Sequence, residues 1–299
     1  MNGLAAFIMR GPAYAGAVAG AGILLGLVLP PFAWFSAAVL ALVALRLGTV
    51  ALLRAVVPAL AGVAILGGVA WGHPGALALA AAVAWLPTLV AALVLRGTVR
   101  LDTTLLVVAA MGWLVVIVST LALADPTATW QHTLLTLFPP DRLANETRVS
   151  ATAIRHLITR MAPLMTGVLA ASVVFSTVSS LLLARWWQAG LYNPGGFGRE
   201  FRALRLGRVA AGVAAVLCVA ALTVGGEVLQ GLALATVALF VFQGLAVVHG
   251  VVARRGMATG WLVALYVLVL FLAPQVMAGL TLVGIADAWA DFRKVALPD

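Results

Sequence analysis

The sequence predicts an all-α protein, a polytopic transmembrane helical bundle with about 8–10 membrane segments and both termini cytoplasmic. Of its 299 residues, 64% are hydrophobic and 9% are charged, whereas soluble domains carry roughly 25% charged residues. Long apolar runs recur along the chain, and about 20 residues of helix cross a hydrocarbon core that is ~30 Å thick. These runs lack the alternation of apolar and polar residues that a membrane β-barrel strand needs.

Glycine, proline and charged residues separate ten predicted segments. The first five are 11–29 and 32–45 on either side of Pro30 and Pro31, 55–71 and 75–95 on either side of "WGHPG", and 103–123. The last five are 161–184, 208–225, 228–251, and the pair 258–273 and 275–289 on either side of Pro274. The second, ninth and tenth segments are short enough to be tilted, re-entrant or half-spans, so eight full crossings is the alternative.

The distribution of basic residues predicts the orientation, because short cytoplasmic loops are enriched in Lys and Arg. With the N-terminus inside, fourteen of the eighteen basic residues fall on the inner face, and the other four lie in the long outer segment 125–160. We therefore expect a multi-pass protein of a bacterial cytoplasmic (inner) membrane. The inner residues are Arg10, Arg46, Arg54, Arg96, Arg100, Arg185, Arg199, Arg202, Arg205, Arg208, Arg254, Arg255, Arg293 and Lys294.

A single integral membrane domain, 1–299, is expected to contain two distinctive extramembrane parts. The outer amphipathic segment 125–160 contains "TWQHTLLTLF", the break "PPDR" and "NETRVSATAIRHLITRM", which predict two short helices. One face of the second helix offers a candidate outer anion or lid site, with a plain interfacial lid as the alternative. Its residues are Arg148, Arg155, His156 and Arg160.

The basic stretch 185–208 is the second extramembrane part and is expected to be the largest cytoplasmic loop. Tryptophan is common where helices leave a membrane, and "NPGG" is a strong turn signal. After this turn, arginines alternate with Phe201, Leu204 and Leu206, as in a short basic helix lying on the inner leaflet. The loop is either an anchor for anionic lipid or a docking surface for a protein partner. The candidate residues are Trp186, Trp187, Asn193, Pro194, Arg199, Arg202 and Arg205.

Four stretches of the chain also resemble a known family: "LLLARWWQAGLYNPGGFGREF", "GPAYAGAVAGAG", "LPPFAWFSAAVLALVALRLG" and "GIADAWADFRK". Together they resemble the YybS-like family of bacterial multi-spanning membrane proteins, which carry a domain of unknown function. That family has been grouped distantly with the substrate-binding S components of energy-coupling-factor transporters. The resemblance implies a ligand-binding membrane component that works with a separate partner.

The predicted sixth segment carries the most polar helical face. Ser172, Ser176 and Ser180 recur every four residues, and Gln243 lies at membrane depth in the eighth segment. A shared polar face of this kind is expected to line a cavity for an uncharged or zwitterionic ligand. The alternative is that the serines bond their own helix carbonyls and support helix packing.

Missing residue patterns exclude several activities. The only lysine is Lys294, so the chain has no phosphate-binding G-x-x-x-x-G-K-[ST] loop, and it has no H-E-x-x-H helix or cysteine cluster. No Asp or Glu falls at the centre of a predicted segment, and Asp287 is expected in an ion pair near Arg293. We therefore expect no enzyme activity, no metal and no cofactor. The basic residues form small clusters beside apolar runs, which indicates lipid rather than nucleic acid as their partner.

Two functions of different classes follow. The first is a permease-like component that binds a small ligand and couples to a membrane or cytoplasmic protein partner, and it predicts a cavity near the serines. The second is a membrane scaffold or assembly factor without a ligand, which predicts a packed bundle. Small residues spaced four apart in the first segment, such as Gly16 and Gly20, permit close helix contact either with a partner or inside the chain.

Overall fold

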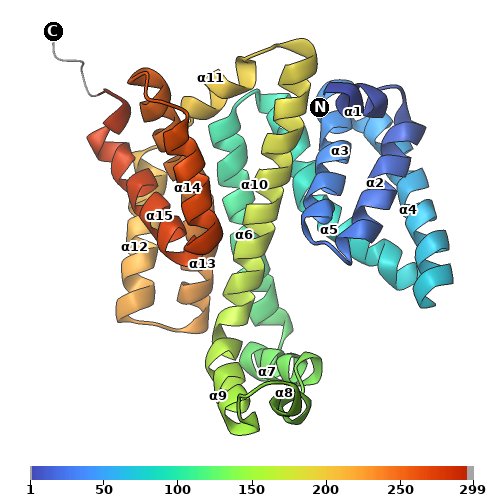
Figure 1. Ribbon diagram of the computed structural model, residues 1–299, viewed down its shortest axis with the longest axis vertical. Helices are drawn as coiled ribbons and strands as arrows, with labels where there is room; N and C mark the ends of the chain where they lie inside the picture. Colours follow the sequence, from blue (N-terminus) through green and yellow to red (C-terminus); the bar gives the residue numbers. More distant parts are fainter. Residues whose placement is uncertain (1, 295–299) are drawn as a thin grey trace.

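The computed structural model describes residues 2–294, and over these residues all regular structure is helical (Figure 1). Ten of the helices coincide with the ten predicted membrane segments, namely α2–α6, α10 and α12–α15. The long elements are α2 (Pro12–Gly26), α3 (Pro31–Leu47), α4 (Thr49–Trp71), α5 (Pro74–Thr98), α6 (Leu101–Ala122), α10 (Met165–Tyr192), α12 (Arg208–Thr223), α13 (Glu227–Arg254), α14 (Gly260–Phe271) and α15 (Ala273–Ala290). The short ones are α1 (Asn2–Ile8), α7 (Pro126–Leu137), α8 (Pro140–Glu146), α9 (Ala151–Met161), η1 (Ala162–Leu164), α11 (Gly196–Arg202) and η2 (Phe292–Lys294).

Five helical stretches are long and apolar enough to cross a membrane. They are α4, α5, α6, the run that joins α9 to α10, and α13. Four apolar helices are shorter, namely α2, α3, α12 and α14. The 15 residues of α2 make a helix about 22 Å long, which does not cross a hydrocarbon core of ~30 Å.

The hairpins α2–α3 and α14–α15 are short, with helices of 15, 17, 12 and 18 residues, and their turns end short of the turn between α12 and α13 (Figure 1). Both turns expose apolar side chains: Val28 is 73% exposed in the first, and Leu270 and Phe271 are 77% and 76% exposed beside the second. Their backbone amides remain bonded, for example Val28 N to Leu25 O at 3.1 Å and Leu272 N to Leu268 O at 2.7 Å. Apolar tips with satisfied amides suit hydrocarbon rather than water.

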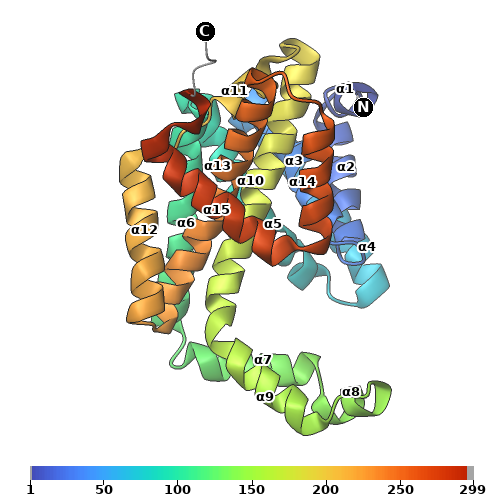
Figure 2. The ribbon, with the colours of Figure 1, turned by 60° about the vertical axis from the view of Figure 1, so that its left-hand side comes forward.

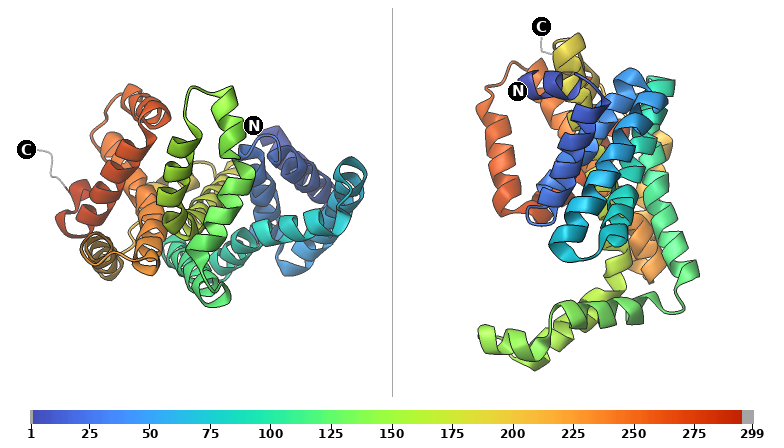
Figure 3. Two further views of the ribbon diagram at one scale, coloured as in Figure 1. Left: turned by 90° about the horizontal axis from the view of Figure 1, so that it is seen from below. Right: turned by 90° about the vertical axis from the view of Figure 1, so that its right-hand side faces the viewer.

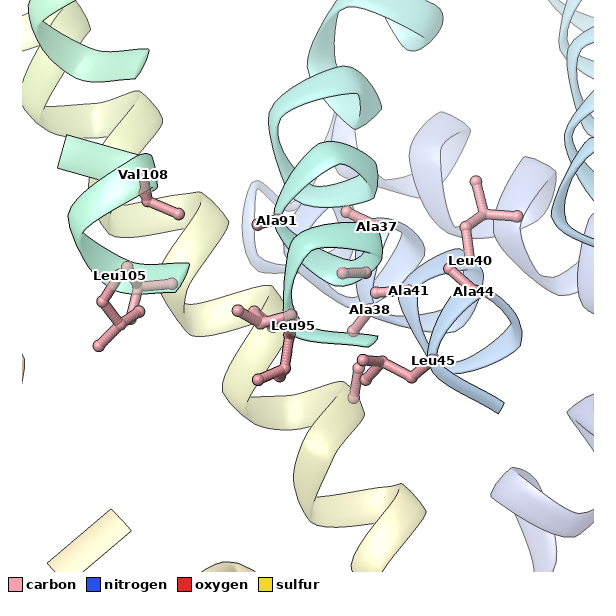
Figure 4. Close-up of a cluster of buried hydrophobic side chains, with 14 of the residues drawn as sticks. Ala37, Ala38, Leu40, Ala41, Ala44, Leu45, Ala91, Leu95, Leu105 and Val108 are labelled. Atoms are coloured by element: carbon pink, nitrogen blue, oxygen red, sulfur yellow. The ribbon is translucent and has the colours of Figure 1, made fainter. Parts of the chain in front are cut away.

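The core of the first half surrounds α3, which is buried without interruption from Ser36 to Leu45. It packs against α2, α4, α5 and α10, and Figure 4 shows Ala37, Ala38 and Ala41 on the side of α3 that is nearer α5. The small face of α2 lies against α4, because a Cβ at Gly16 would come within 2.7 Å of the Ala55 carbonyl oxygen. The small residues of the first segment are therefore used in contacts inside the chain.

The centre of the second half is α13, which packs against α10, α6, α12 and α15. It crosses α15 at two glycines, Gly244 and Gly284, so closely that backbone meets backbone. A Cβ at Gly284 would lie 2.6 Å from the Phe240 carbonyl oxygen, and one at Gly244 would overlap the carbonyl of Leu280. Glycine is required at this crossing because any side chain would push the helices apart.

The segment 125–160 folds as α7, α8 and α9, which project sideways from one end of the bundle as an arm (Figures 2 and 3). The side chains of Asp125 and Ser150 cap α7 and α9 by accepting from Ala128 N and Ala153 N. Trp130 Nε1 donates to Thr166 Oγ1 at 3.0 Å and joins α7 to the start of α10. The sequence predicted two helices here, and the "PPDR" break forms the third.

The opposite end of the bundle, which we call the basic end, carries α1, α11 and η2, the first turns of α4, α6 and α12, and the last turns of α3, α5, α10, α13 and α15 (Figure 1). The fourteen basic residues assigned to the inner face all lie in the elements and turns of this end, and the arm holds the other four. The charge distribution is thus segregated along the long axis, as the positive-inside rule requires of a membrane protein.

The expected loop 185–208 begins eight residues later than the sequence suggested, because α10 continues through Tyr192. The extra turns are held by contacts with the rest of the bundle: Trp187 is 5% exposed and packs edge-to-face on Phe35 at 5.2 Å. The Arg46 guanidinium lies 4.2 Å from the centre of the Tyr192 ring. A tryptophan pair after an apolar run was therefore a poor marker of the helix end.

A buried ion pair joins the basic end together. Arg293 Nη2 donates to Asp287 Oδ2 at 2.5 Å, and these side chains are only 4% and 1% exposed. Arg293 Nη1 also donates to the carbonyl oxygens of Arg202 and Leu204 at 2.9 and 2.8 Å. One arginine therefore fixes the end of α15 to the segment that follows α11.

Replacing Gly284 by Ala should destabilise the bundle by about 1–3 kcal/mol, the usual cost of overpacking. Gly279→Ala is the matched control on the same helix, because a Cβ there meets nothing within 4 Å. Thermal unfolding in detergent should show a lower midpoint for G284A only. Equal midpoints for the two variants would contradict the close crossing.

Asp287→Asn should cost about 3–5 kcal/mol, because it leaves the buried Arg293 charge uncompensated. Asp102→Asn removes the partner of Arg100 in a pair whose side chains are 32% and 68% exposed, and such surface pairs contribute about 0–1 kcal/mol. Chemical unfolding of both variants compares the two pairs directly. A D287N protein as stable as D102N would show that the pair contributes little.

Candidate functional site

The three predicted serines of α10 line one cavity of about 750 Å³, which we call the serine cavity. Successive serines lie four residues apart, which is a rise of about 6 Å along the helix. Ser172, nearest the arm, is exposed, Ser176 is half-buried, and Ser180 is 1% exposed. The serines therefore become more deeply buried from the arm end of the cavity toward the basic end.

Five helices form its walls. The short hairpins α2–α3 and α14–α15 contribute the residues nearest their turns. Ala33, Trp34 and Ala37 come from the first turns of α3, and Met277 comes from the first turns of α15. The remaining walls are α5, α10 and α13. Because both hairpins end early, the space beside α10 is left unfilled there.

The lining is apolar apart from the three serines and Thr88 of α5, and none of the described residues that line it is charged. Thr88 is 2% exposed. Trp34 and Phe175 meet edge-to-face with ring centroids 5.7 Å apart. Apolar and aromatic walls with a few hydroxyl groups are typical of sites for small uncharged molecules.

The hydroxyl of Ser180 has no hydrogen-bond partner among the described residues, although its oxygen is buried. Ser176 Oγ donates to the Val173 carbonyl at 3.2 Å, as serines in helices usually do. Ser36 is also fully satisfied: it donates to Ala19 O at 2.6 Å and accepts from Trp85 Nε1 at 2.9 Å. Buried polar groups are normally bonded, and among the described residues only Ser180 Oγ and Arg293 Nε are buried without a partner. Of these two atoms, only the Ser180 hydroxyl belongs to a residue that lines the serine cavity.

Gln243 does not belong to this cavity. Its Oε1 accepts from Leu206 N and its Nε2 donates to Gly284 O, both at 2.8 Å, and the residue is 1% exposed. The glutamine thus bonds the segment after α11 to both α13 and α15. The sequence singled out this glutamine, but its partners come from distant segments that the sequence does not place.

The basic stretch also differs from its predicted form. The helix α11 ends at Arg202, and Leu204 and Leu206 are 3% and 5% exposed. The apolar residues that were expected to face lipid instead pack into the protein. The prediction of a basic helix that continues along the inner leaflet was therefore wrong. The turn is as predicted, with Gly196 N donating to Asn193 O at 2.9 Å.

The candidate docking residues separate into two groups. Trp187 is buried and serves packing, whereas Trp186 is 39% exposed and Asn193, Pro194, Arg199, Arg202 and Arg205 are all exposed. These residues belong to one end of α10, to α11 and to the turns beside α11. They remain available to lipid or protein at the basic end.

Arg205 bonds to Asp291 at 2.5 Å. The Arg205 guanidinium, followed by Lys294, lowers the pKa of the Asp291 carboxyl. Because this pKa is lowered in the folded protein, the pair stabilises the fold fully at pH values above the ordinary carboxyl pKa of about 3.9. This stabilisation is lost as the pH falls through the lowered pKa. The pair therefore holds α15 against the segment after α11 at neutral pH.

Arg148, Arg155, His156 and Arg160 are exposed on the arm and line no part of the serine cavity. Arg155 Nη2 donates to both carboxylate oxygens of Asp141, at 3.1 and 3.0 Å, and so holds α9 against α8. The proposed role of these residues in binding an anion stays a prediction.

Sequence reasoning missed Trp34, Thr88 and Phe175 as lining residues. Phe175 was accessible in principle, because it precedes Ser176 on the same helix. Trp34 and Thr88 lie more than eighty residues away in the chain, and no pattern in the sequence places α3 and α5 beside α10. Within residues 2–294 there is no group of three or more His, Cys, Asp or Glu side chains arranged for a metal ion.

In comparisons with protein-family models, curated proteins and solved structures, no match to this chain was found. The resemblance to the YybS-like family therefore stays a prediction drawn from the sequence.

Ser180→Ala should leave the free energy of unfolding unchanged or raise it slightly, because the lost hydroxyl has no partner to leave behind. Ser36→Ala is the matched control, because it leaves the buried indole N–H of Trp85 without an acceptor. This change should lower the free energy of unfolding by about 1–3 kcal/mol. Unfolding in detergent measures both. A Ser180→Ala protein as destabilised as Ser36→Ala would mean that Ser180 is bonded within the fold.

Proposed function

We propose that this protein is a permease-like membrane component that binds a small uncharged ligand in the serine cavity. The observation that carries the proposal is the unpartnered, buried hydroxyl of Ser180 at the closed end of a cavity of about 750 Å³. A hydroxyl without a partner is costly to bury, and a ligand that hydrogen-bonds to it removes this cost.

The lining selects the chemistry of this ligand. Ligand sites commonly occupy about 300–1,000 Å³ and combine apolar walls with a few polar groups. Ser172, Ser176, Ser180 and Thr88 offer hydroxyls, which both donate and accept, but no charged side chain among the lining residues offsets a charge on the ligand. A charged ligand would lose its hydration without compensation.

The segregation of charge supports an orientation with the basic end in the cytoplasm and the arm outside. The cavity then opens toward the outer side, because Ser172 is exposed and Ser180 is buried. We place the protein in a bacterial cytoplasmic membrane. The exposed arginines around α11 would meet anionic lipid or a cytoplasmic partner that supplies energy.

The alternative function, a scaffold without a ligand, predicts a bundle packed without such a cavity. A cavity of this size lined by a row of hydroxyls favours the binding function over the scaffold. Both functions use the basic end as a contact surface, so that end does not discriminate between them.

Mass spectrometry of the protein purified from membranes in mild detergent tests the proposal. The wild type should release a bound small molecule, and Ser180→Leu, which fills the closed end of the cavity, should lose most of it. Ser119→Ala on α6 is the control, because Ser119 does not line the serine cavity. A wild-type protein that repeatedly carries no small molecule, or a Ser180→Leu protein that retains it fully, would contradict the binding function.

A further inference from the structure

A second cavity of about 610 Å³ lies nearer the basic end, between α10, α11, α13 and α14, and we call it the aromatic cavity. Its walls include Phe197, Phe201, Phe242, His249 and Tyr266, and the exposed Arg202 is the one arginine among the described residues that line it. None of these residues was singled out as a ligand site by the sequence, and none lines the serine cavity.

The rings of the aromatic cavity contact one another in sequence. Phe197 and Phe201 stack with centroids 5.9 Å apart and planes 16° apart. Phe201 meets His249 edge-to-face at 5.6 Å, and His249 meets Tyr266 at 5.9 Å. Stacked and edge-on rings present flat faces and polarised edges that favour a planar partner.

His249 and Tyr266 add a defined hydrogen-bonding group. His249 Nδ1 lies 2.8 Å from the Leu245 carbonyl oxygen, which only accepts, so this nitrogen carries the proton. In the neutral ring Nε2 then accepts from the Tyr266 hydroxyl at 3.2 Å. The tyrosine oxygen keeps a lone pair, which is free to accept a hydrogen bond from a ligand.

The two cavities lie in series along the same two helices. On α10 the serine cavity takes residues up to Ser180, whereas the aromatic cavity takes Ser179 and Leu182. On α13 the serine cavity ends at Val241 and the aromatic cavity begins at Phe242. On each helix the lining therefore changes from one cavity to the other between neighbouring residues.

One pair of aromatic rings joins the linings of the two cavities. Phe175 lines the serine cavity and Phe242 lines the aromatic cavity, and their ring centroids are 5.1 Å apart with planes tilted by 42°. Ring centroids this close mean that the two side chains are in contact, so a change of rotamer in either side chain alters the boundary between the two cavities.

We propose that the aromatic cavity is a second ligand site and that Phe175 and Phe242 form the gate between it and the serine cavity. The ligand class is a small, uncharged solute with a planar ring and a hydrogen-bond donor. The path rests on the proposed binding function of the serine cavity, but the aromatic site rests only on its own lining. In the proposed orientation, the path runs from the outer side toward the cytoplasm.

Cysteine accessibility tests the gate without knowledge of the ligand. The only native cysteine, Cys218, is changed to Ser, and Ser180→Cys is then treated with a membrane-impermeant thiol reagent in sealed vesicles of each orientation. Ser180→Cys should react from the arm side and not from the basic side. Adding Phe175→Ala and Phe242→Ala should abolish this side preference.

Phe240→Ala is the control for the gate, because Phe240 is a buried phenylalanine of α13 that lines neither cavity. It should leave the side preference intact. Reaction of Ser180→Cys from both sides with the gate residues present would overturn the gate. A side preference that survives the double change would overturn it equally.

Equilibrium dialysis against naphthol, with the protein in nanodiscs and empty nanodiscs as the blank, tests the second site. The wild type should bind two equivalents, and His249→Leu and Ser180→Leu should each lose one. Loss in His249→Leu alone would retain the aromatic site and reject the serine site. Loss in Ser180→Leu alone, or binding by neither site, would overturn the second site.

Discussion

The difference in length between α10 and the hairpins beside it determines where this molecule has free space. The central helix α10 has 28 residues, whereas α2, α3 and α14 have 15, 17 and 12. Protein interiors otherwise pack tightly, so the part of a helix that extends beyond its shorter neighbours must contact lipid, another helix or a cavity. Here the walls close around α10 from α3, α5, α13 and α15, and its serine face borders a cavity.

The short hairpins α2–α3 and α14–α15 need firm attachment to the bundle, because their exposed apolar turns end part-way along its length. The first is held by the continuous burial of α3, and the second by the glycine crossing of α13 and α15. At the basic end, Gln243, Asp287 and Arg293 bond the chain after α11 to the same helices. These attachments hold the walls of the serine cavity in place, and no such bond reaches the Ser180 hydroxyl within residues 2–294. Rigid support and one unsatisfied group together favour binding over further packing.

The helical architecture could be predicted from the sequence because hydrocarbon requires long apolar helices, and all ten predicted segments correspond to helices. The serine row followed from helical periodicity alone. The rest depended on contacts between distant segments. The sequence predicted Gln243 to line the cavity, but in the structure its side-chain amide is hydrogen-bonded to Leu206 and Gly284. The sequence predicted Trp187 to be an interfacial anchor, but in the structure its ring packs against Phe35. Local patterns predict elements and faces, but the partner of each face is a property of the tertiary structure.

An experimental density map of the protein in nanodiscs made from native lipid tests the central claim most directly. The account predicts non-protein density in the serine cavity, with an atom about 3 Å from Ser180 Oγ, a normal hydrogen-bond distance. The opposite result is a collapsed cavity in which the side chains of α3, α5 and α13 close on α10 and the Ser180 hydroxyl bonds to a carbonyl of its own helix. That result would make the serine row a packing feature and would contradict a ligand site there.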